Sequence, residues 1–169
     1  MFVYKPEIKR KLPVTVCALS FALGAVLIIL SILEIGWSLG EQVAALVMFV
    51  IGIEITTRYL MTEYTYKLGG DGDSPELAVI KRGGTREMAV CNIGFDTVVC
   101  VERRGKLRDF ERKYGRMDAR YNYCANMRPR DAAVIHFEFN GKKVLLTLEA
   151  DDTFFSLLEE RVPKGGGEG

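Results

Sequence analysis

Histidine is nearly absent from this sequence, which holds His136 alone, and the two signs of charge almost balance at a formal net charge of +1. Cys91 and Cys100 stand nine residues apart, which does not match zinc-site spacing, and no glycine-rich phosphate loop is present. We therefore expect neither a metal site nor a cofactor. The near-neutral charge also argues against a protein that binds nucleic acid.

A thiol enzyme would need a cysteine activated by a base, and Cys124 with His136 is the pair to consider. No third residue in the pattern would orient the imidazole, so packing roles are expected for both side chains. The sequence therefore predicts a protein that is not an enzyme. Unusually fast reaction of Cys124 with an alkylating probe would contradict this prediction.

The first long apolar segment, residues 12–33, reads LPVTVCALSFALGAVLIILSIL and carries no charge. As a helix it would rise about 33 Å, enough to cross a hydrocarbon core about 30 Å thick. A secretory signal peptide would have a shorter apolar run closed by a small-residue cleavage pattern. The segment therefore predicts a transmembrane helix.

A second apolar segment occupies residues 37–59, although its strictly uncharged run, residues 42–53, would also suit a buried helix. Trp37 and Tyr59 stand where interfacial aromatic residues belong. Glu54 and Arg58, four residues apart, are expected to form an interfacial ion pair. Residues 12–60 are thus predicted to form a two-helix transmembrane hairpin behind a flank of residues 1–11.

Lysine and arginine are distributed unevenly around this hairpin. Four precede it, none lies in the short connection, and eighteen follow Tyr59. The positive-inside rule then places both termini and the soluble domain in the cytoplasm, at the inner (plasma) membrane. Disulfides are rare in that reducing compartment, so free thiols are expected at Cys17, Cys91, Cys100 and Cys124.

Residues 61–162 alternate mostly with the period of strands, and residues 163–169, PKGGGEG, favour a flexible tail. Strands are expected at EYTYKL, ELAVIKR, TREMAVCN and FDTVVCVE. The pair Asn140–Gly141 predicts a type I′ hairpin turn. Counting outward from it gives a core-facing set of pairs: Phe139–Lys142, Phe137–Val144, Ile135–Leu146 and Ala133–Leu148. The opposite face, with His136, should be solvated or partly covered.

The segment EADDTFFSLLEERV changes to helical spacing, with apolar residues at Phe154, Leu157, Leu158 and Val162. Residues 151–153 offer an N-cap and negative charge at the helix start, where both stabilise a helix. One amphipathic helix is therefore expected to end the fold.

Strands in consecutive hairpins followed by one C-terminal helix resemble a pleckstrin-homology (PH) domain. YTYKL, LAVIKRGG and NGKKVLLTLEADDTFFSLLEE, behind two apolar helices, resemble bacterial membrane proteins with two N-terminal transmembrane helices and a C-terminal PH-like domain. The resemblance implies an α+β fold with a small antiparallel β-barrel or sandwich of six or seven strands. The loop GGDGDSP carries Asp71 and Asp73 and no base, so phosphoinositide binding of the eukaryotic PH type is not expected, and it lacks the later ligands of a calcium loop.

Residues 101–116, VERRGKLRDFERKYGR, hold seven basic residues and three acids. Leu107, Phe110 and Tyr114 would dock a short helix on the domain, leaving the bases as a solvated face or a binding surface. Lys81 and Arg86 could face each other across the Gly83–Gly84 turn. The candidate anion- or partner-binding residues are Lys81, Arg86, Arg103, Arg104, Lys106, Arg108, Arg112, Lys113 and Arg116.

These patterns predict a non-enzymatic integral membrane protein, a scaffold or adaptor whose cytoplasmic domain binds a protein partner or an anionic membrane surface. Each basic residue near an anionic leaflet would contribute about 1 kcal/mol. The alternative is an oligomeric channel or transporter component, in which Glu54 would matter for transport. Small residues at Ala18, Ala22, Ser20 and Gly24 would permit helix contact within the hairpin or in a homo-oligomer.

Overall fold

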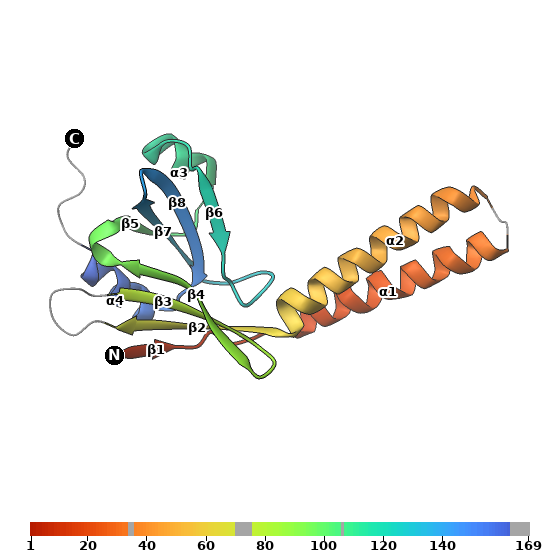
Figure 1. The fold of residues 1–169 in the computed structure, drawn as a ribbon, viewed down its shortest axis with the longest axis horizontal. Coiled ribbons are helices and arrows are strands. Elements are labelled where there is room, and N and C mark those ends of the chain that lie inside the picture. The colour runs from red at the N-terminus through yellow and green to blue at the C-terminus, as the bar shows by residue number, and fades with distance from the viewer. Residues whose placement is uncertain (34–35, 70–75, 106, 163–169) are drawn as a thin grey trace. The chain divides into compact units, whose positions relative to one another are not determined.

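The computed structural model describes residues 1–33, 36–69, 76–105 and 107–162. The chain divides into two compact units. Ile8–Thr62 forms a helical unit, and Met1–Glu7 with Glu63–Gly169 forms a strand-rich unit. The helical unit is thus an insertion near the start of the strand-rich one, after its first strand (Figure 1).

The helical unit consists of α1 (Lys11–Ile32) and α2 (Ser38–Ile55), which continues as the π-helical turn η1 (Thr56–Leu60). Both helices are long and apolar enough to cross a membrane, with mean hydropathies of 2.5 and 1.7. The two apolar helices predicted over residues 12–33 and 37–59 are therefore confirmed. Most of their side chains point away from the helix interface, since only 17% of each apolar window is buried.

Two glycines, each facing a phenylalanine, bring α1 and α2 close together. A Cβ atom at Gly24 would lie 3.2 Å from Phe49 Cζ, and one at Gly52 would lie 3.0 Å from Phe21 Cζ. Ser20 is buried on the same side of α1 as Gly24. Among the small residues, then, Ser20 and Gly24 serve the hairpin itself, while Ala18 and Ala22 are exposed.

The strand-rich unit contains two four-stranded sheets. The first has the order β1 (Phe2–Tyr4), β2 (Thr62–Gly69), β3 (Glu76–Gly83) and β4 (Arg86–Gly94), and the second the order β5 (Val98–Arg103), β7 (Ala132–Phe139), β8 (Lys142–Glu149) and β6 (Ala119–Asn122). A short 3-10 helix, η2 (Phe95–Thr97), joins β4 to β5. The helices α3 (Leu107–Tyr114) and α4 (Asp152–Arg161) complete the unit.

The strand β1 lies within residues 1–11, which the sequence predicted only as a flank of the helical hairpin. It pairs antiparallel with β2, with Phe2 opposite Leu68 and Tyr4 opposite Tyr66. A strand of three residues carries too little alternation to be read from sequence. Its partner β2 begins only after the whole helical hairpin.

The β7–β8 hairpin follows its prediction residue by residue. Asn140 and Gly141 have φ angles of 50° and 72°, as a type I′ turn requires. The expected pairs, including Phe137 with Val144 and Ile135 with Leu146, are all present. Phe139 departs from the predicted core face, because its side chain is 62% exposed.

The predicted α+β class is confirmed, but the prediction of an antiparallel barrel or sandwich built from consecutive hairpins is corrected in two respects. The two sheets do not close into a barrel, and β6 runs parallel to β8. The physical reason lies in residues 104–118, which include α3. This connection carries the chain from β5 at one edge of the second sheet to β6 at the other, across the intervening β7 and β8.

The helix α4 begins as predicted, and it buries Phe154 and Leu158 of the predicted apolar face together with Phe155. Asp151 caps it by accepting a hydrogen bond from the N–H of Phe154 at 2.7 Å. The fully buried ring of Phe154 stacks on Tyr4, with centroids 4.7 Å apart, and on Tyr66 at 5.9 Å. Tyr66 in turn donates from its Oη to the carbonyl of Tyr123 at 2.7 Å, and burial raises the pKa of its phenol. These contacts tie α4 and both sheets into one core.

We expect Phe154→Ala to lower the free energy of unfolding of the strand-rich unit by about 3–5 kcal/mol, because it removes the shared ring of this stack and leaves a cavity. Urea unfolding of the full chain in detergent micelles, followed by circular dichroism, measures the change. The matched control is Phe139→Ala, whose ring is exposed and should cost less than about 1 kcal/mol. Equal losses in the two variants would contradict the packing described.

Candidate functional site

The helix α3 covers part of the outer face of the second sheet, the face turned away from the core. Phe110 and Tyr114 pack there against a buried cluster of Met117, Val134 and Leu145. The predicted docking of α3 through Phe110 and Tyr114 is therefore confirmed, while the side chain of Leu107 lies outside the described residues.

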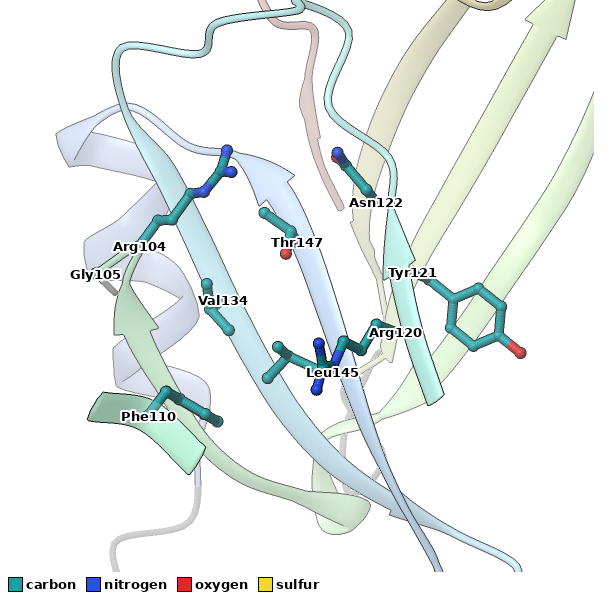
Figure 2. Close-up of a pocket in the computed structure, with 9 residues that line it drawn as sticks. All are labelled: Arg104, Gly105, Phe110, Arg120, Tyr121, Asn122, Val134, Leu145 and Thr147. Carbon is teal, nitrogen blue, oxygen red and sulfur yellow. The ribbon is translucent and has the colours of Figure 1, made fainter. Parts of the chain in front are cut away.

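Beside α3, the same outer face contains a hollow of about 170 Å³, which we call the arginine pocket. Its lining combines an apolar floor with polar groups at the sides: Val134, Leu145, Phe110, Arg104, Arg120, Asn122 and Thr147. Figure 2 shows Arg104 on the β5 side and Arg120 on the β6 side, with the Tyr121 ring pointing away. The arrangement suits a ligand that is negatively charged and partly apolar.

The two arginines of the pocket differ in how they are held. The Arg120 guanidinium forms an ion pair with Glu111 of α3. The backbone N–H of Arg104 donates to the carbonyl of Ala132 at 2.8 Å, which fixes its position. Within the described part of the chain, no ion pair or side-chain hydrogen bond is recorded for the Arg104 guanidinium. Arg104 is therefore the base of this pocket that is available to an external anion.

A second hollow of about 380 Å³ is also lined by Arg104. It is lined by Arg103, Arg104, Arg130 and Asp131, together with Pro129, Gly105 and Ala132. Because the Arg103 guanidinium is paired with Asp152, the net positive charge of this region comes from Arg104 and Arg130 against Asp131. Arg104 lines both hollows, so it lies at the centre of the basic surface.

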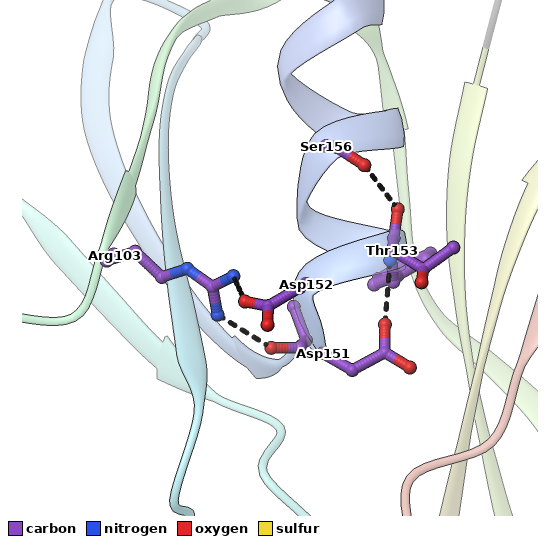
Figure 3. A network of polar contacts seen from close by, with 7 residues as sticks. Arg103, Asp151, Asp152, Thr153 and Ser156 are labelled. Atoms are coloured by element: carbon purple, nitrogen blue, oxygen red, sulfur yellow. Dashed lines mark hydrogen bonds and ion pairs between the residues drawn. The ribbon is translucent and has the colours of Figure 1, made fainter.

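Arg103 has a structural role in this arrangement (Figure 3). Its guanidinium donates to the carbonyl of Ala150 at 3.1 Å, pairs with Asp152, and lies 4.2 Å from the ring centroid of Phe155. Ala150, Asp152 and Phe155 surround the start of α4, so Arg103 holds that helix against β5. The positive charge of Arg103 is therefore paired with a carboxylate of the same chain.

Lys113 is also paired within the chain. Its Nζ lies 2.5 Å from Glu102 Oε1, and Tyr114 Oη donates to the same oxygen at 2.7 Å. The hydrogen bond to Glu102 raises the pKa of Lys113. The ammonium group thus secures α3 to β5, although it remains exposed to solvent.

The other candidate bases lie in several places. Arg112 and Arg116 are exposed at the end of α3, whereas Lys106 and the side chain of Arg108 lie outside the described residues. The β3–β4 turn is Gly84–Thr85, so Arg86 stands opposite Gly83 and Lys81 opposite Met88. Lys81 and Arg86 therefore do not face each other and are separate exposed bases, because the turn begins one residue later than the Gly83–Gly84 turn that would pair them.

In the helical unit, Glu54 is exposed on α2, and the Arg58 guanidinium carbon lies 5.4 Å from the Tyr59 ring centroid. The ion pair between Glu54 and Arg58 stays a prediction. The four cysteines are free thiols, with Cys17 and Cys124 buried and Cys91 and Cys100 half-buried.

His136 lies beneath α3 on the outer face of β7, where it is 2% exposed. Its ring stands edge-on to Phe110 and 5.7 Å from the ring of Tyr114, between centroids. Neither ring nitrogen has a hydrogen-bond partner within the described residues, so no catalytic pair with Cys124 is formed. The described residues likewise contain no group of three metal-ligating side chains, and Asp71 and Asp73 fall outside them.

The sequence pattern missed Arg120, Asn122 and Thr147. For Arg120 and Asn122, the pattern that could have revealed them is the alternation in ARYNY. It puts these two residues on one face of the strand and Ala119, Tyr121 and Tyr123 on the other. That alternation gains meaning only when β6 is placed beside β8. No family model, curated protein or solved structure matches this chain, so its function is inferred from this geometry.

We expect acid to destabilise the contact between α3 and the sheet through His136. Burial lowers the pKa of His136 below its ordinary value of 6.5, and the nearby Lys143 lowers it further while Glu138 opposes this. Between these two pKa values, the imidazole of His136 is protonated in the unfolded chain and neutral in the folded chain. Stability is therefore full above pH 6.5 and falls by up to about 1.4 kcal/mol per pH unit as the pH drops from there to the folded-state pKa.

Urea unfolding of the full chain at a series of pH values between 7.5 and roughly 5 measures this effect. In the His136→Leu variant, the free energy of unfolding should depend less on pH below pH 6.5, because the variant has no imidazole to titrate. If the free energies of unfolding of the two proteins fell in parallel with pH, His136 would not be the group responsible.

Proposed function

We propose that this chain is a non-enzymatic integral membrane protein, a scaffold or adaptor whose cytoplasmic domain binds an acidic group of a protein partner or of an anionic membrane surface. The observation that carries the proposal is the arginine pocket, in which the Arg104 guanidinium, without an ion-pair partner among the described residues, borders an apolar floor of Val134, Leu145 and Phe110. An anionic group can pair with Arg104 while its apolar neighbour covers the floor.

Membrane insertion with both ends on one side is supported by the chain connectivity. β1 precedes the helical hairpin, β2 follows it, and the two strands pair in one sheet. Two apolar helices that leave from and return to one folded unit can cross a membrane only as a hairpin. The basic residues on both flanks favour the cytoplasmic side for that unit.

We keep the relationship to bacterial PH-like membrane proteins as part of this proposal. The β3–β4 and β7–β8 hairpins and the C-terminal α4 support it, whereas the parallel pairing of β6 with β8 departs from the PH pattern. The proposed binding does not depend on this relationship, because it rests on the residues of the pocket.

The test uses the full chain in nanodiscs of neutral lipid, mixed with vesicles that contain or lack an anionic phospholipid. Arg104→Gln should weaken binding to the anionic vesicles about five-fold, the loss expected for one basic residue near such a surface. Flotation across a salt series measures the binding, which should fall as salt rises. The matched control is Arg86→Gln, which removes the same charge from the β3–β4 turn.

Equal binding by the Arg104 and Arg86 variants would mean that net charge, rather than the pocket, drives association. Indifference of the wild-type protein to both vesicle types would exclude the membrane surface. A photo-crosslinking residue at position 104, used in native membranes, would then test for a protein partner. No crosslinked product and no vesicle binding together would overturn the proposed function.

A further inference from the structure

The helix α3 brings two adjacent side chains to the arginine pocket. Phe110 packs on its apolar floor, against Val134 and Leu145. The neighbouring residue, Glu111, pairs with the Arg120 guanidinium. Figure 2 shows the Phe110 ring entering from α3 and the Arg120 side chain from β6. The outer face of the second sheet thus already holds an apolar group beside a carboxylate, and both belong to the chain itself.

This combination of groups is the one that the pocket suits in an external ligand, an anion next to an apolar group. Glu111 neutralises the positive charge of Arg120, so Arg104 is left as the base of the described lining that an external anion can reach. The Glu111 carboxylate also repels an incoming anion at short range. Its side chain is only 27% exposed, so water and salt screen this repulsion less than they would at an open surface.

The helix α3 is held to the sheet by contacts that a ligand can replace. It has eight residues, too few to be a stable helix without its packing. Its ion pairs with β5 and β6 are partly exposed to solvent, where such pairs contribute little. Beneath it, both ring nitrogens of the buried His136 lack a partner among the described residues, which opposes docking of the helix. The rings of Phe110 and Tyr114 are therefore the main contact that keeps α3 in place.

We propose that α3 is an autoinhibitory element, in which Phe110 and Glu111 act as an internal pseudo-ligand and an external acidic group must replace Glu111 at Arg120 to bind at full strength. This inference rests on the proposed function, because it concerns the same pocket. It adds Arg120 as a second anion-binding residue, which becomes available only when Glu111 leaves.

The test uses the full chain in nanodiscs of neutral lipid, with flotation of vesicles that contain an anionic phospholipid. Glu111→Gln frees Arg120 and should strengthen binding about five-fold, the gain expected for one basic residue near such a surface. Adding Arg120→Gln to this variant should return binding to the wild-type level, because the freed guanidinium is then absent. The matched control is Asp109→Asn, which removes the same charge from an exposed position of α3 and should change binding less than about two-fold.

Modification of arginine by phenylglyoxal, located by mass spectrometry, reports without any ligand whether Glu111 covers Arg120. In the wild-type protein Arg120 should react more slowly than Arg104, and Glu111→Gln should raise the rate at Arg120. Lys113→Gln is the matched control, since it removes the other ion pair of α3 and leaves Glu111 on Arg120. It should leave the rate at Arg120 unchanged. Thermal unfolding of each variant verifies that the fold is kept.

The outcomes separate this inference from the proposed function. Wild-type binding that Glu111→Gln does not strengthen would overturn the autoinhibition alone, and so would a gain that survives in the double variant or an unchanged reaction rate at Arg120. If the vesicles bind neither protein, the membrane surface is excluded, and the crosslinked product from position 104 should form in higher yield in the Glu111→Gln variant. No vesicle binding and no crosslinked product in either protein would overturn both proposals.

Discussion

The stack of Phe154 on Tyr4 and Tyr66 is the contact on which the strand-rich unit depends. Tyr4 precedes the helical hairpin, Tyr66 follows it, and Phe154 comes from the C-terminal helix, so the stack joins three distant parts of the chain. Tyr66 extends the connection to the second sheet through its hydrogen bond to Tyr123. The unit can therefore close only after the chain has passed through both apolar helices and returned. The half-buried rings of Phe2 and Tyr4 stack on Phe154, and cutting the chain after the hairpin would remove them.

The same closure explains why hollows lie on both sides of β6. The C-terminal α4 fills the stack beside β1 and β5, and α3 covers only part of the outer face of the second sheet. β6 is left with a partly covered outer face and an open inner one. Because successive side chains of a strand point to opposite faces, Arg120 and Asn122 reach the arginine pocket while Tyr121 and Tyr123 line a groove of about 790 Å³ on the other side. One short strand thus borders two surfaces of different chemistry.

The sequence predictions were correct where the local structure is determined by residues that are neighbours in the chain. The Asn140–Gly141 turn fixes its own geometry and hence the register of β7 and β8, and Asp151 caps α4 without help from distant residues. The position of β6 depends instead on the path of residues 104–118 over the sheet, which no local pattern specifies. Arg104 could therefore be chosen as a candidate from its charge, whereas Arg120 and Thr147, its partners in the pocket, could not.

The basic stretch at residues 101–116 shows why a count of charges does not locate a binding site. Arg103 and Lys113 lie close to carboxylates of Asp152 and Glu102, and these pairs hold α4 and α3 in place. A guanidinium that already has hydrogen-bond acceptors gains little from an external anion, since the new contact must replace existing ones. Arg104 differs only by one position from Arg103, yet its side chain borders an open apolar floor. Successive side chains along β5 and just after it point to opposite faces of the sheet, so Arg103 and Arg104 lie on different faces. This alternation determines that the charge of Arg104, and not that of Arg103, remains available for binding.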